Sequence, residues 1–410
     1  MPETRIVLKN CEKIDPQDLE GYLAVDGFKA WEKCEKELGP DGVLKEIKAS
    51  GLLGRGGAGF SCGQKWELAK GSEGDEKFLI CNAEEGEMGA FKDRAILSGD
   101  PFSLIEGMMI AGYTIGAKQA YLYLRNEYIS LLKGLEQALQ QARENGFLRD
   151  VDIQIILSSG SYVCGEETAL MESIEGKRGE PRYKPPFPPV KGLFERPTVI
   201  NNVETLVNIP RIILKGSQWF RTMGTEKSKG TKVFSISGDV ERPGVYELLL
   251  GSPLRDLVVD LAGAENVKAV LVGGASGRFL PSQLLSTPLA FEEVLGSGAV
   301  IVFNQSRDII DIIQKNIEFF NNESCGKCTP CREGTEVMME IFSRLVKAEG
   351  RQEDLRTLEE LSRAMKLASL CGLGQSVPVS VLDSLHFFKS DYEQRLSQSC
   401  FLRSLKRKIT

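Results

Sequence analysis

Short β-rich runs alternate with longer helical patterns between about residues 75 and 215, and this alternation constrains the fold more than any other feature. The β-rich runs are 78–81, 120–124 and 153–157. The helical patterns lie near 101–116, 127–145, 166–175 and 201–215. Strands that alternate with crossover helices form a parallel sheet covered by helices. The sequence therefore predicts an α/β domain, in a chain whose 410 residues exceed the size of one ordinary core.

The pattern changes towards the C-terminal half. From Lys232 onwards, short strand signals are separated by glycine turns and by one helical pattern near 253–262. These strand signals lie around 244–246, 269–272 and 299–303. After Arg307 the strand signals stop, and apolar residues recur at helical spacing. The helical segments are 309–320, 337–346, 355–367 and 379–396. We therefore expect a small α+β domain followed by a helical bundle.

The charge balance excludes two classes of partner. The chain has 51 basic and 57 acidic residues and a net charge of −6, so it has no electrostatic footprint for nucleic acid or anionic lipid. The basic tail 402–408 is interpreted as a solvated end or a subunit contact. No apolar run approaches the roughly 18 residues of a membrane span, and the N-terminus lacks a secretory pattern. We expect a cytoplasmic protein that reaches a membrane only through partner subunits.

Three of the ten cysteines are clustered in Cys325-Gly-Lys-Cys328-Thr-Pro-Cys331. A loop with this spacing wraps three corners of an iron-sulfur cubane, whereas zinc ribbons pair two well-separated CxxC units. No cysteine follows three residues later, so a fourth ligand must come from elsewhere. Cys371 lies in an expected turn between helices and Cys400 lies beside the basic tail, and we expect Cys371 to be the ligand.

The remaining five cysteines are scattered singly along the chain. They are Cys11, Cys34, Cys62, Cys81 and Cys164. We expect them to act as small buried hydrophobic residues.

Residues 54–60, Gly-Arg-Gly-Gly-Ala-Gly-Phe, match the G-x-G-x-x-G pattern of dinucleotide sites. That pattern requires a preceding strand, but residues 43–49 have a helical pattern. The ordinary dinucleotide interpretation therefore fails. A loop of small residues still exposes backbone amides to a flat or phosphorylated ligand, and Lys65 adds a cation suited to a phosphate.

Two acidic segments, 82–87 and 162–167, follow expected strands, and ligands bind at such ends of parallel sheets. Their carboxylates suit the hydroxyl groups of a nucleotide or flavin, although Glu166 and Glu167 are equally suited to cap a helix. The proline-rich strap 184–189 presents one aromatic and one cationic side chain. It is alternatively a linker or an SH3-type ligand.

Together, five motifs resemble the NADH-binding flavoprotein subunit of respiratory complex I. These motifs are Gly54 to Phe60, Cys164 to Leu170, Lys184 to Pro188, Ile200 to Thr205 and Glu323 to Gly334. The same module occurs in soluble NAD-linked hydrogenases, including bifurcating ones, and in NAD-dependent formate dehydrogenases. The motifs occur in the family's order and cover nearly the whole chain. The terminal electron acceptor stays open among quinone, protons, ferredoxin and carbon dioxide.

The resemblance implies three domains and their ligands. A Rossmann-like FMN- and NADH-binding domain with an N-terminal extension spans 1–228, a ubiquitin-like β-grasp (SLBB) domain spans 229–306, and a four-helix bundle with a 4Fe-4S cluster spans 307–410. The implied FMN contacts are Gly54, Gly56, Lys65, Asn82, Glu84, Tyr162, Gly165, Glu166, Asn201, Asn202 and Thr205, with Arg55 and Gly57 as further loop residues at the cofactor. The implied NADH contacts are Phe60, Glu87, Glu167, Lys184 and Phe187. The implied cluster ligands are Cys325, Cys328, Cys331 and Cys371.

The implied activity is NADH dehydrogenation, with hydride passing from NADH to FMN and single electrons passing on to the cluster. No protein acid or base is required at the hydride step, because the cofactors supply the chemistry. The expected partners are a thioredoxin-like 2Fe-2S subunit and a larger iron-sulfur subunit. Glu167 should repel a 2′-phosphate, which predicts at least about a hundredfold preference for NADH over NADPH.

This sequence departs from the complex I pattern at two places. Leu68 replaces a usual aromatic residue, and Glu84-Glu85-Gly86 replaces Asp-Glu-Ser. The Glu-Glu-Gly variant of this chain resembles the soluble enzymes more closely. Two other functions compete with NADH oxidation. One is an iron-sulfur relay whose flavin site has decayed, and the other is a zinc-stabilised protein that binds a sugar or nucleotide.

Overall fold

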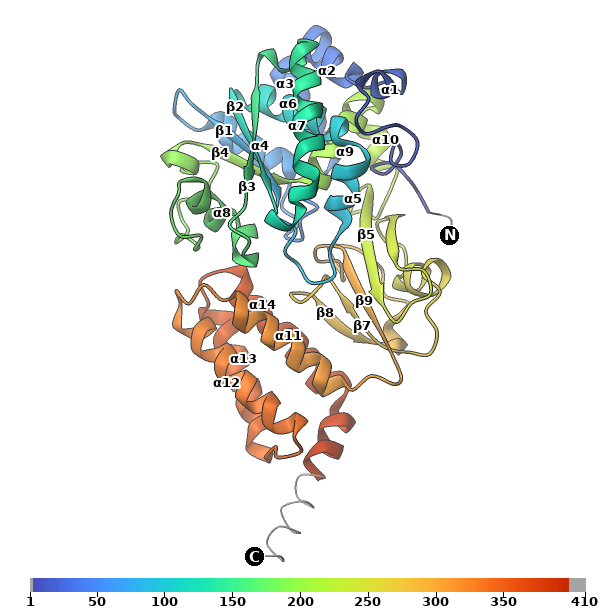
Figure 1. Ribbon diagram of the computed structural model, residues 1–410, viewed down its shortest axis with the longest axis vertical. Coiled ribbons are helices and arrows are strands. Elements are labelled where there is room, and N and C mark those ends of the chain that lie inside the picture. Colours follow the sequence, from blue (N-terminus) through green and yellow to red (C-terminus); the bar gives the residue numbers. More distant parts are fainter. Residues whose placement is uncertain (1–2, 398–410) are drawn as a thin grey trace, which may run out of the picture.

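The computed structural model describes residues 3–397, so Cys400 and the basic tail 402–408 lie outside the described residues. Its first sheet has four parallel strands in the order β3-β2-β1-β4 (Figure 1). The strands are β1 (Phe78–Ala83), β2 (Gln119–Leu124), β3 (Asp152–Leu157) and β4 (Thr198–Asn202). In this register Asn82 of β1 lies beside Asn202 of β4. The expected parallel sheet is confirmed.

Helices cover both faces of this sheet because the central strand β1 is apolar on both sides. Leu79 and Cys81 pack with helices α6 and α9, while Ile80 packs on the opposite face with Leu170 of α8. The main covering helices are α3 (Gly39–Ser50), α4 (Cys62–Gly71), α5 (Lys92–Gly99), α6 (Pro101–Ile115), α7 (Ile129–Glu144), α8 (Glu167–Ile174) and α9 (Val203–Lys215). Smaller helices are α1 (Leu19–Ala24), α2 (Lys29–Lys33) and α10 (Ser217–Arg221).

The helix expected at 201–215 requires a correction. Residues 198–202 form strand β4, and α9 begins only at Val203. The Asn202 side chain accepts a hydrogen bond from the Glu204 N–H group and so caps the helix. The apolar run before Asn202 is short and continuous, and such a run does not separate a buried strand from a helix by periodicity.

The second sheet has five strands in the order β6-β5-β9-β7-β8. They are β5 (Thr231–Gly238), β6 (Gly244–Leu249), β7 (Val267–Val272), β8 (Arg278–Pro281) and β9 (Ala299–Asn304). Strands β5 and β9 are parallel, and the other pairs are antiparallel. A π-type helix, Asp256–Leu261, contributes Leu257 and Val258 to the apolar core of this sheet. Strands β5 and β8 were not among the strands expected from the sequence.

The C-terminal region is helical, as expected. Its helices are α11 (Ile309–Glu323), α12 (Thr329–Val346), α13 (Gln352–Ala368) and α14 (Gly372–Phe387). The segment expected at 379–396 is instead divided, because α14 starts at Gly372 and residues 389–397 form further helical turns. One buried cluster includes Ile80 of β1, Leu271 of β7 and Ile313 of α11, so all three regions share a core.

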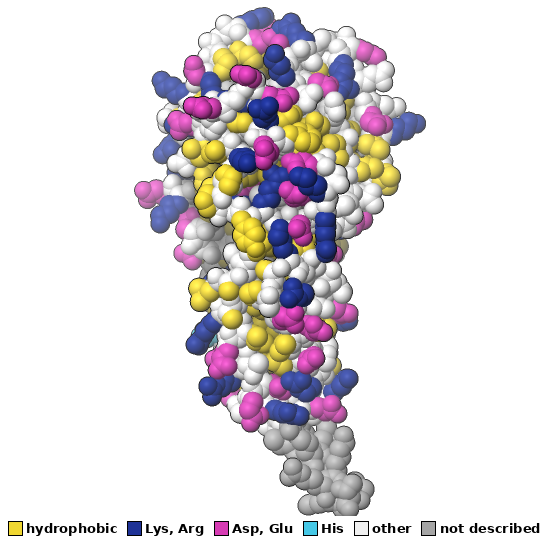
Figure 2. Space-filling view, turned by 90° about the vertical axis from the view of Figure 1, so that its left-hand side faces the viewer, with side chains coloured by type: hydrophobic (Ala, Val, Ile, Leu, Met, Phe, Trp, Pro, Cys, Tyr) yellow, Lys and Arg dark blue, Asp and Glu magenta, His cyan; other side chains and the backbone are white. Residues whose placement is uncertain are grey.

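The surface and the helices set limits on partners. No helix among residues 3–397 combines the length and the apolar character that a membrane crossing requires. On the face shown in Figure 2, basic and acidic side chains are interspersed. The parallel sheet, the second sheet and the helical region of this mixed α/β fold pack against one another through the shared buried cluster.

Candidate functional site

A cavity of about 1200 Å³ opens at the C-terminal edge of the parallel sheet. The strand order reverses around β1, with β2 and β3 on one side and β4 on the other. Such a switch point leaves a crevice where open α/β sheets bind ligands. The residues lining the cavity from this part of the chain are Gly56, Gly57, Ala58, Asn82, Glu84, Glu85, Gly86, Glu87, Ala90, Lys92, Asp93, Tyr162, Val163, Gly165, Glu166 and Asn202. The second sheet and α14 complete the lining with Ser276, Gly296, Ser297, Gly372, Leu373 and Ser376.

The glycine loop follows helix α3 and forms one wall of this cavity. Gly57 has φ +122°, and a Cβ atom there would lie 3.4 Å from the backbone nitrogen of Ser297. A Cβ atom on Gly56 would lie 3.3 Å from Cβ of Asn202. The loop is fixed from behind, because the Arg55 N–H group donates to Oγ1 of Thr205 over 2.8 Å. The small residues therefore let the loop pack closely against Asn202 and Ser297, and the loop lines the cavity without a bulky side chain.

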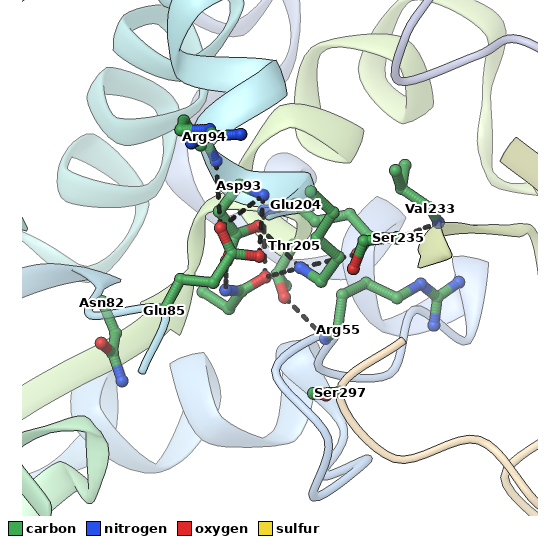
Figure 3. A network of polar contacts seen from close by, with 12 residues as sticks. Arg55, Asn82, Glu85, Asp93, Arg94, Glu204, Thr205, Val233, Ser235 and Ser297 are labelled. Carbon is green, nitrogen blue, oxygen red and sulfur yellow. Dashed lines mark hydrogen bonds and ion pairs between the residues drawn. The ribbon is translucent and has the colours of Figure 1, made fainter. Parts of the chain in front are cut away.

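The Arg55 side chain extends away from Asn82 and from the cavity (Figure 3). Its guanidinium donates to the carbonyl oxygens of Leu53 and Lys229 over 3.0 and 2.5 Å, and burial lowers its pKa to about 10. Thr205 is likewise turned towards the loop backbone. Arg55 and Thr205 therefore shape the loop, and neither side chain lines the cavity.

The carboxylates after β1 have different surroundings. Burial raises the pKa of Glu84 to about 7, and its Oε2 atom has no hydrogen-bond partner. Glu85 instead accepts the N–H groups of Asp93 and Arg94 at the start of α5, as Figure 3 shows. Glu87 accepts hydroxyl groups from Tyr162 and from Ser276 over 2.9 and 2.6 Å. Glu84 is therefore the carboxylate whose hydrogen bonding a ligand would complete.

The two asparagines expected at the cofactor differ as well. Asn82 lines the cavity and donates to the Gly165 carbonyl oxygen over 2.9 Å. Asn201 is buried beneath the sheet edge, where its Oδ1 atom accepts the indole N–H group of Trp66 over 2.8 Å. Asn201 therefore orients Trp66 and does not line the cavity.

A second polar group lies around the N-terminus of α8. The Glu166 carboxylate caps this helix by accepting the N–H groups of Thr168 and Ala169, each over 2.9 Å, and it also lines the cavity. Lys184 donates to Glu166 and Glu167, each over 2.8 Å. The capping alternative and the cavity position thus both hold for Glu166.

Lys65 belongs to this second group and does not line the cavity. Its ammonium lies 3.6 Å from Glu167 and donates to the Ile200 carbonyl oxygen over 3.1 Å. It also lies 5.9 Å from the ring centre of Phe60. Phe60 and Phe187 expose 48% and 55% of their surface, so two aromatic side chains are free to stack on a ligand beside these charges.

The four cysteines expected at a cluster surround a separate cavity of about 270 Å³. Its lining is Val163, Pro181, Ser324, Cys325, Lys327, Cys328, Cys331, Leu370, Cys371 and Leu373. Burial raises the pKa of Cys371 to about 11, while the N–H groups of Leu373 and Gly374 oppose that rise. No three His, Cys, Asp or Glu side chains within residues 3–397 are placed to hold a single metal ion. The five other cysteines of the described chain are buried and unpaired, as expected.

The two cavities are neighbours, since Val163 and Leu373 line both. The loop of the cysteine motif is held by the segment that precedes the proline strap. Arg178 donates to the Cys325 carbonyl oxygen over 2.7 Å, and Lys327 donates to the Pro181 carbonyl oxygen over 2.9 Å. A redox group in one cavity would therefore be in close reach of a group in the other.

Lining residues from outside the first sheet carried little signal in the sequence. Ser276, Ser297 and Leu373 belong to segments whose local patterns show only turns or a helix start. Lys92 was missed as well, although the run Lys92-Asp93-Arg94 places charges directly after an acidic segment. A local pattern of this kind does not differ from that of an exposed helix start.

Comparison with known proteins gives two matching sequence profiles. Residues 47–211 match the Nuo51 FMN-binding domain. Residues 311–395 match the iron-sulfur binding region of NADH-ubiquinone oxidoreductase-F. The first range contains the glycine loop and both acidic segments, and the second contains all four clustered cysteines.

The chain is also similar to whole proteins. It is 42% identical to the NADP-reducing hydrogenase subunit HndC of Solidesulfovibrio fructosivorans, over 95% of this chain and 83% of that one. It is 41% identical to the F 2 subunit of NADH-quinone oxidoreductase of Rhizobium meliloti (strain 1021), over 96% of this chain and 98% of that one. The fold matches a crystal structure of an NAD+-reducing NiFe-hydrogenase in the H2-reduced state, with a TM-score of 0.89 and 40% identity over 96% of this chain and 67% of that one.

Proposed function

This chain belongs to the family of the F-type subunits of NADH-quinone oxidoreductase and their hydrogenase counterparts, and we propose on that premise that it oxidises NADH with FMN and passes electrons singly to a 4Fe-4S cluster. The observation that carries the proposal is the contact between the two cavities through Val163 and Leu373. A protein that takes two electrons from one donor and passes them on singly needs its flavin beside its first cluster.

The larger cavity suits FMN. The glycine loop offers a wall without side chains, and the unpartnered Oε2 atom of Glu84 offers an acceptor for a ribityl hydroxyl group. We propose that Gly56, Gly57, Asn82 and Glu84 contact the flavin, with Tyr162, Gly165, Glu166 and Asn202 at its other edges. Bound FMN accepts hydride from NADH and releases electrons one at a time. The chain itself binds, orients and excludes water, and no protein acid or base is assigned.

The group around α8 suits NADH. We propose that Phe60 and Phe187 stack on the adenine and that Glu167 accepts the ribose hydroxyl groups. Lys184 currently bridges Glu166 and Glu167, and an ammonium at this position also suits the pyrophosphate. NADPH is the alternative substrate, because the Solidesulfovibrio relative is described as NADP-reducing. Glu167 favours NADH here, since its negative carboxylate would repel the 2′-phosphate of NADPH.

The smaller cavity suits a 4Fe-4S cluster. Four thiols line it, from Cys325 and Cys328 before α12, from Cys331 in the first turn of α12, and from Cys371 at the N-terminus of α14. Four thiolates are the usual ligand set of a cubane, which carries single electrons. We propose Cys325, Cys328, Cys331 and Cys371 as the ligands.

Finer features of fold and assembly belong to the same proposal. We interpret the second sheet as a β-grasp (SLBB) unit and helices α11 to α14 as a four-helix bundle, with domain boundaries near residues 228 and 306. The relatives are named as subunits of oxidoreductase and hydrogenase complexes. A thioredoxin-like 2Fe-2S subunit and a larger iron-sulfur subunit are the proposed acceptors, because a single exit cluster must pass its electrons on. The cytoplasmic location stays a prediction.

Purification of the chain with analysis of flavin, iron and sulfide tests the proposal. We expect FMN, iron with acid-labile sulfide, and NADH-dependent reduction of ferricyanide. Iron and sulfide without flavin, and without NADH oxidation, would instead support the relay with a decayed flavin site. Zinc without iron or sulfide would support the zinc-stabilised binding protein.

A further inference from the structure

A ligand that carries a phosphate group meets an unfavourable charge in the larger cavity. Five carboxylates line it, from Glu84, Glu85, Glu87, Asp93 and Glu166. Among the residues of 3–397 that line this cavity, Lys92 is the one basic residue. Lys65, the cation expected for a phosphate from the sequence, is instead engaged with Glu167 and the Ile200 carbonyl oxygen. A phosphate in this cavity therefore has one candidate ammonium partner.

Lys92 is held by a buried network that joins the two sheets. Its ammonium lies 2.6 Å from Asp93 and 3.0 Å from Glu204, and each of these side chains exposes 4% or less of its surface. Glu204 also pairs with Lys232 of β5 over 2.5 Å and accepts the Val233 N–H group over 2.8 Å. Figure 3 shows Glu204 in this position, with Asp93 on one side and Val233 on the other. The network fixes the Lys92 ammonium at the cavity wall.

The position of Lys92 matches one end of the cavity. Its ammonium lies 3.4 Å from Oδ1 of Asn202, and Asn202 is the neighbour of Gly56 in the glycine loop. Asp93 holds the Asn202 amide by accepting its Nδ2–H group over 2.6 Å. Val163 and Leu373 form the part of the lining that is shared with the cysteine cavity. A flavin must place its ring at this shared part to deliver electrons, which leaves the part lined by Lys92 and Asn202 for its phosphate.

We propose that Lys92, together with Asn202 and the backbone amides of the glycine loop, forms the phosphate-binding end of the flavin site. Glu204 and Lys232 are positioning residues that hold the Lys92 ammonium. Lys232 thus gives the second sheet a part in flavin binding. The inference rests on the proposed FMN site and adds the residue that selects the phosphorylated flavin. Burial lowers the pKa of Lys232 to about 7, so a nearby dianion would also favour its protonated form.

The test compares FMN with riboflavin, which has the same ring and ribityl chain but no phosphate. Both flavins are titrated into the flavin-depleted full chain, and their dissociation constants are measured by fluorescence quenching. In the wild type, FMN should bind more tightly than riboflavin. Lys92→Met should lower this ratio at least about tenfold, because one charged hydrogen bond to the phosphate is lost. Riboflavin affinity should change much less.

Removal of Lys92 takes one cation away from the buried carboxylates of Asp93 and Glu204, so a second variant guards against misfolding. Lys92→Met/Asp93→Asn keeps the charge balance and should show the same loss of the FMN-to-riboflavin ratio. Lys45→Met, at an exposed position on α3, is the matched control and should keep the wild-type ratio. Lys92→Arg should retain part of the preference.

Three results would overturn the inference. An unchanged ratio in both Lys92 variants would show that the phosphate lies elsewhere. Equal weakening of both flavins would assign Lys92 a purely structural role. Loss of the ratio in Lys65→Met, with Lys92→Met unchanged, would assign the phosphate to Lys65. A wild-type chain that binds neither flavin would instead contradict the proposed FMN function itself.

Discussion

The two cavities are built in different ways. The cysteine cavity takes three of its four thiols from the seven residues 325–331 and the fourth from one helix start. The larger cavity, which we propose for the flavin, takes its lining from segments that extend from Gly56 to Ser376 and from all three regions of the fold. A site held by four thiol ligands depends on each ligand completely, whereas a site assembled from many segments loses affinity in steps. Substitutions should therefore act as all-or-none changes in one cavity and graded changes in the other.

Substitution of a cluster ligand should have the largest effect. We expect Cys371→Ser to lose the 4Fe-4S signal, because three thiolates from one loop cannot fill four cubane corners. Iron content and the EPR spectrum of the reduced chain measure the effect, and the helical region should also lose stability. Cys400→Ser, outside the described residues, is the control and should leave the cluster intact. The reverse pattern would identify Cys400 as the ligand.

A graded effect is expected for Glu84, whose Oε2 atom has no partner. Glu84→Gln should weaken FMN binding roughly 10- to 100-fold, because a charged acceptor for a hydroxyl group is lost. The flavin-free variant should be at least as stable as the wild type above about pH 7, since the buried carboxylate costs stability when it ionises. Calorimetric titration and thermal unfolding measure the two quantities.

Glu247 provides the matched control for Glu84. It is also a buried carboxylate, but it accepts the N–H groups of Ile6, Val7 and Leu8 and does not line the cavity. Glu247→Gln should lower stability by about 1–3 kcal/mol and leave FMN affinity unchanged. If Glu84→Gln behaves like Glu247→Gln, then Glu84 supports the fold and not the flavin.

A smaller change is expected in substrate choice. Burial opposes ionisation of Glu167, but the ammonium groups of Lys65 and Lys184 hold its pKa below the usual value. Glu167→Gln would remove one carboxylate from beside these two cations and leave Lys184 paired with Glu166, which favours a 2′-phosphate. We expect the ratio of kcat/KM for NADPH to that for NADH to rise about tenfold. Steady-state reduction of ferricyanide measures this ratio.

Glu172→Gln is the control for Glu167, because Glu172 lies on the same helix and pairs with Arg182. It should leave the NADPH-to-NADH ratio unchanged. If Glu167 only supported helix α8, both substrates would suffer equally in Glu167→Gln. An unchanged ratio would then show that this glutamate does not contact the ribose.

The smallest expected effect is a dependence of flavin affinity on pH. The pKa of Glu84 is raised to about 7 by burial, and Arg125, Glu127 and Glu323 are the charged groups that act on it. Ribityl hydroxyl groups donate to the ionised form, so affinity should rise about threefold between about pH 6.5 and about pH 7.5. Riboflavin is the suitable ligand because it has no phosphate to titrate. A flat profile in the wild type, or the same slope in Glu84→Gln, would contradict this role.

The difference between the cavities also explains what the sequence could predict. The spacing of Cys325, Cys328 and Cys331 is local, so three of the four proposed cluster ligands could be named from the sequence alone. The parallel sheet and the helical region were predicted for the same reason, since their periodicities are local. The roles of Asn201 and Thr205 could not be predicted, because tertiary contacts turn these side chains towards Trp66 and the Arg55 backbone.

Residues that meet only through tertiary packing were the hardest to find. Lys92 and Lys232 lie far apart in the sequence, and only the pairing of both with Glu204 places them together. Ser297 and Leu373 line the flavin cavity although neither lies near a ligand motif of the first sheet. Pattern analysis does not supply such contacts, since it contains no information on how separate units pack.

An anaerobic titration of the purified chain with NADH, followed by absorbance and EPR, tests electron flow between the two cavities most directly. We predict that NADH bleaches the flavin absorbance and then produces the EPR signal of a reduced 4Fe-4S cluster, without any partner subunit. A cluster that dithionite reduces but NADH does not, in a chain that retains its FMN, would contradict the proposed transfer of electrons from NADH through the flavin to these cysteines.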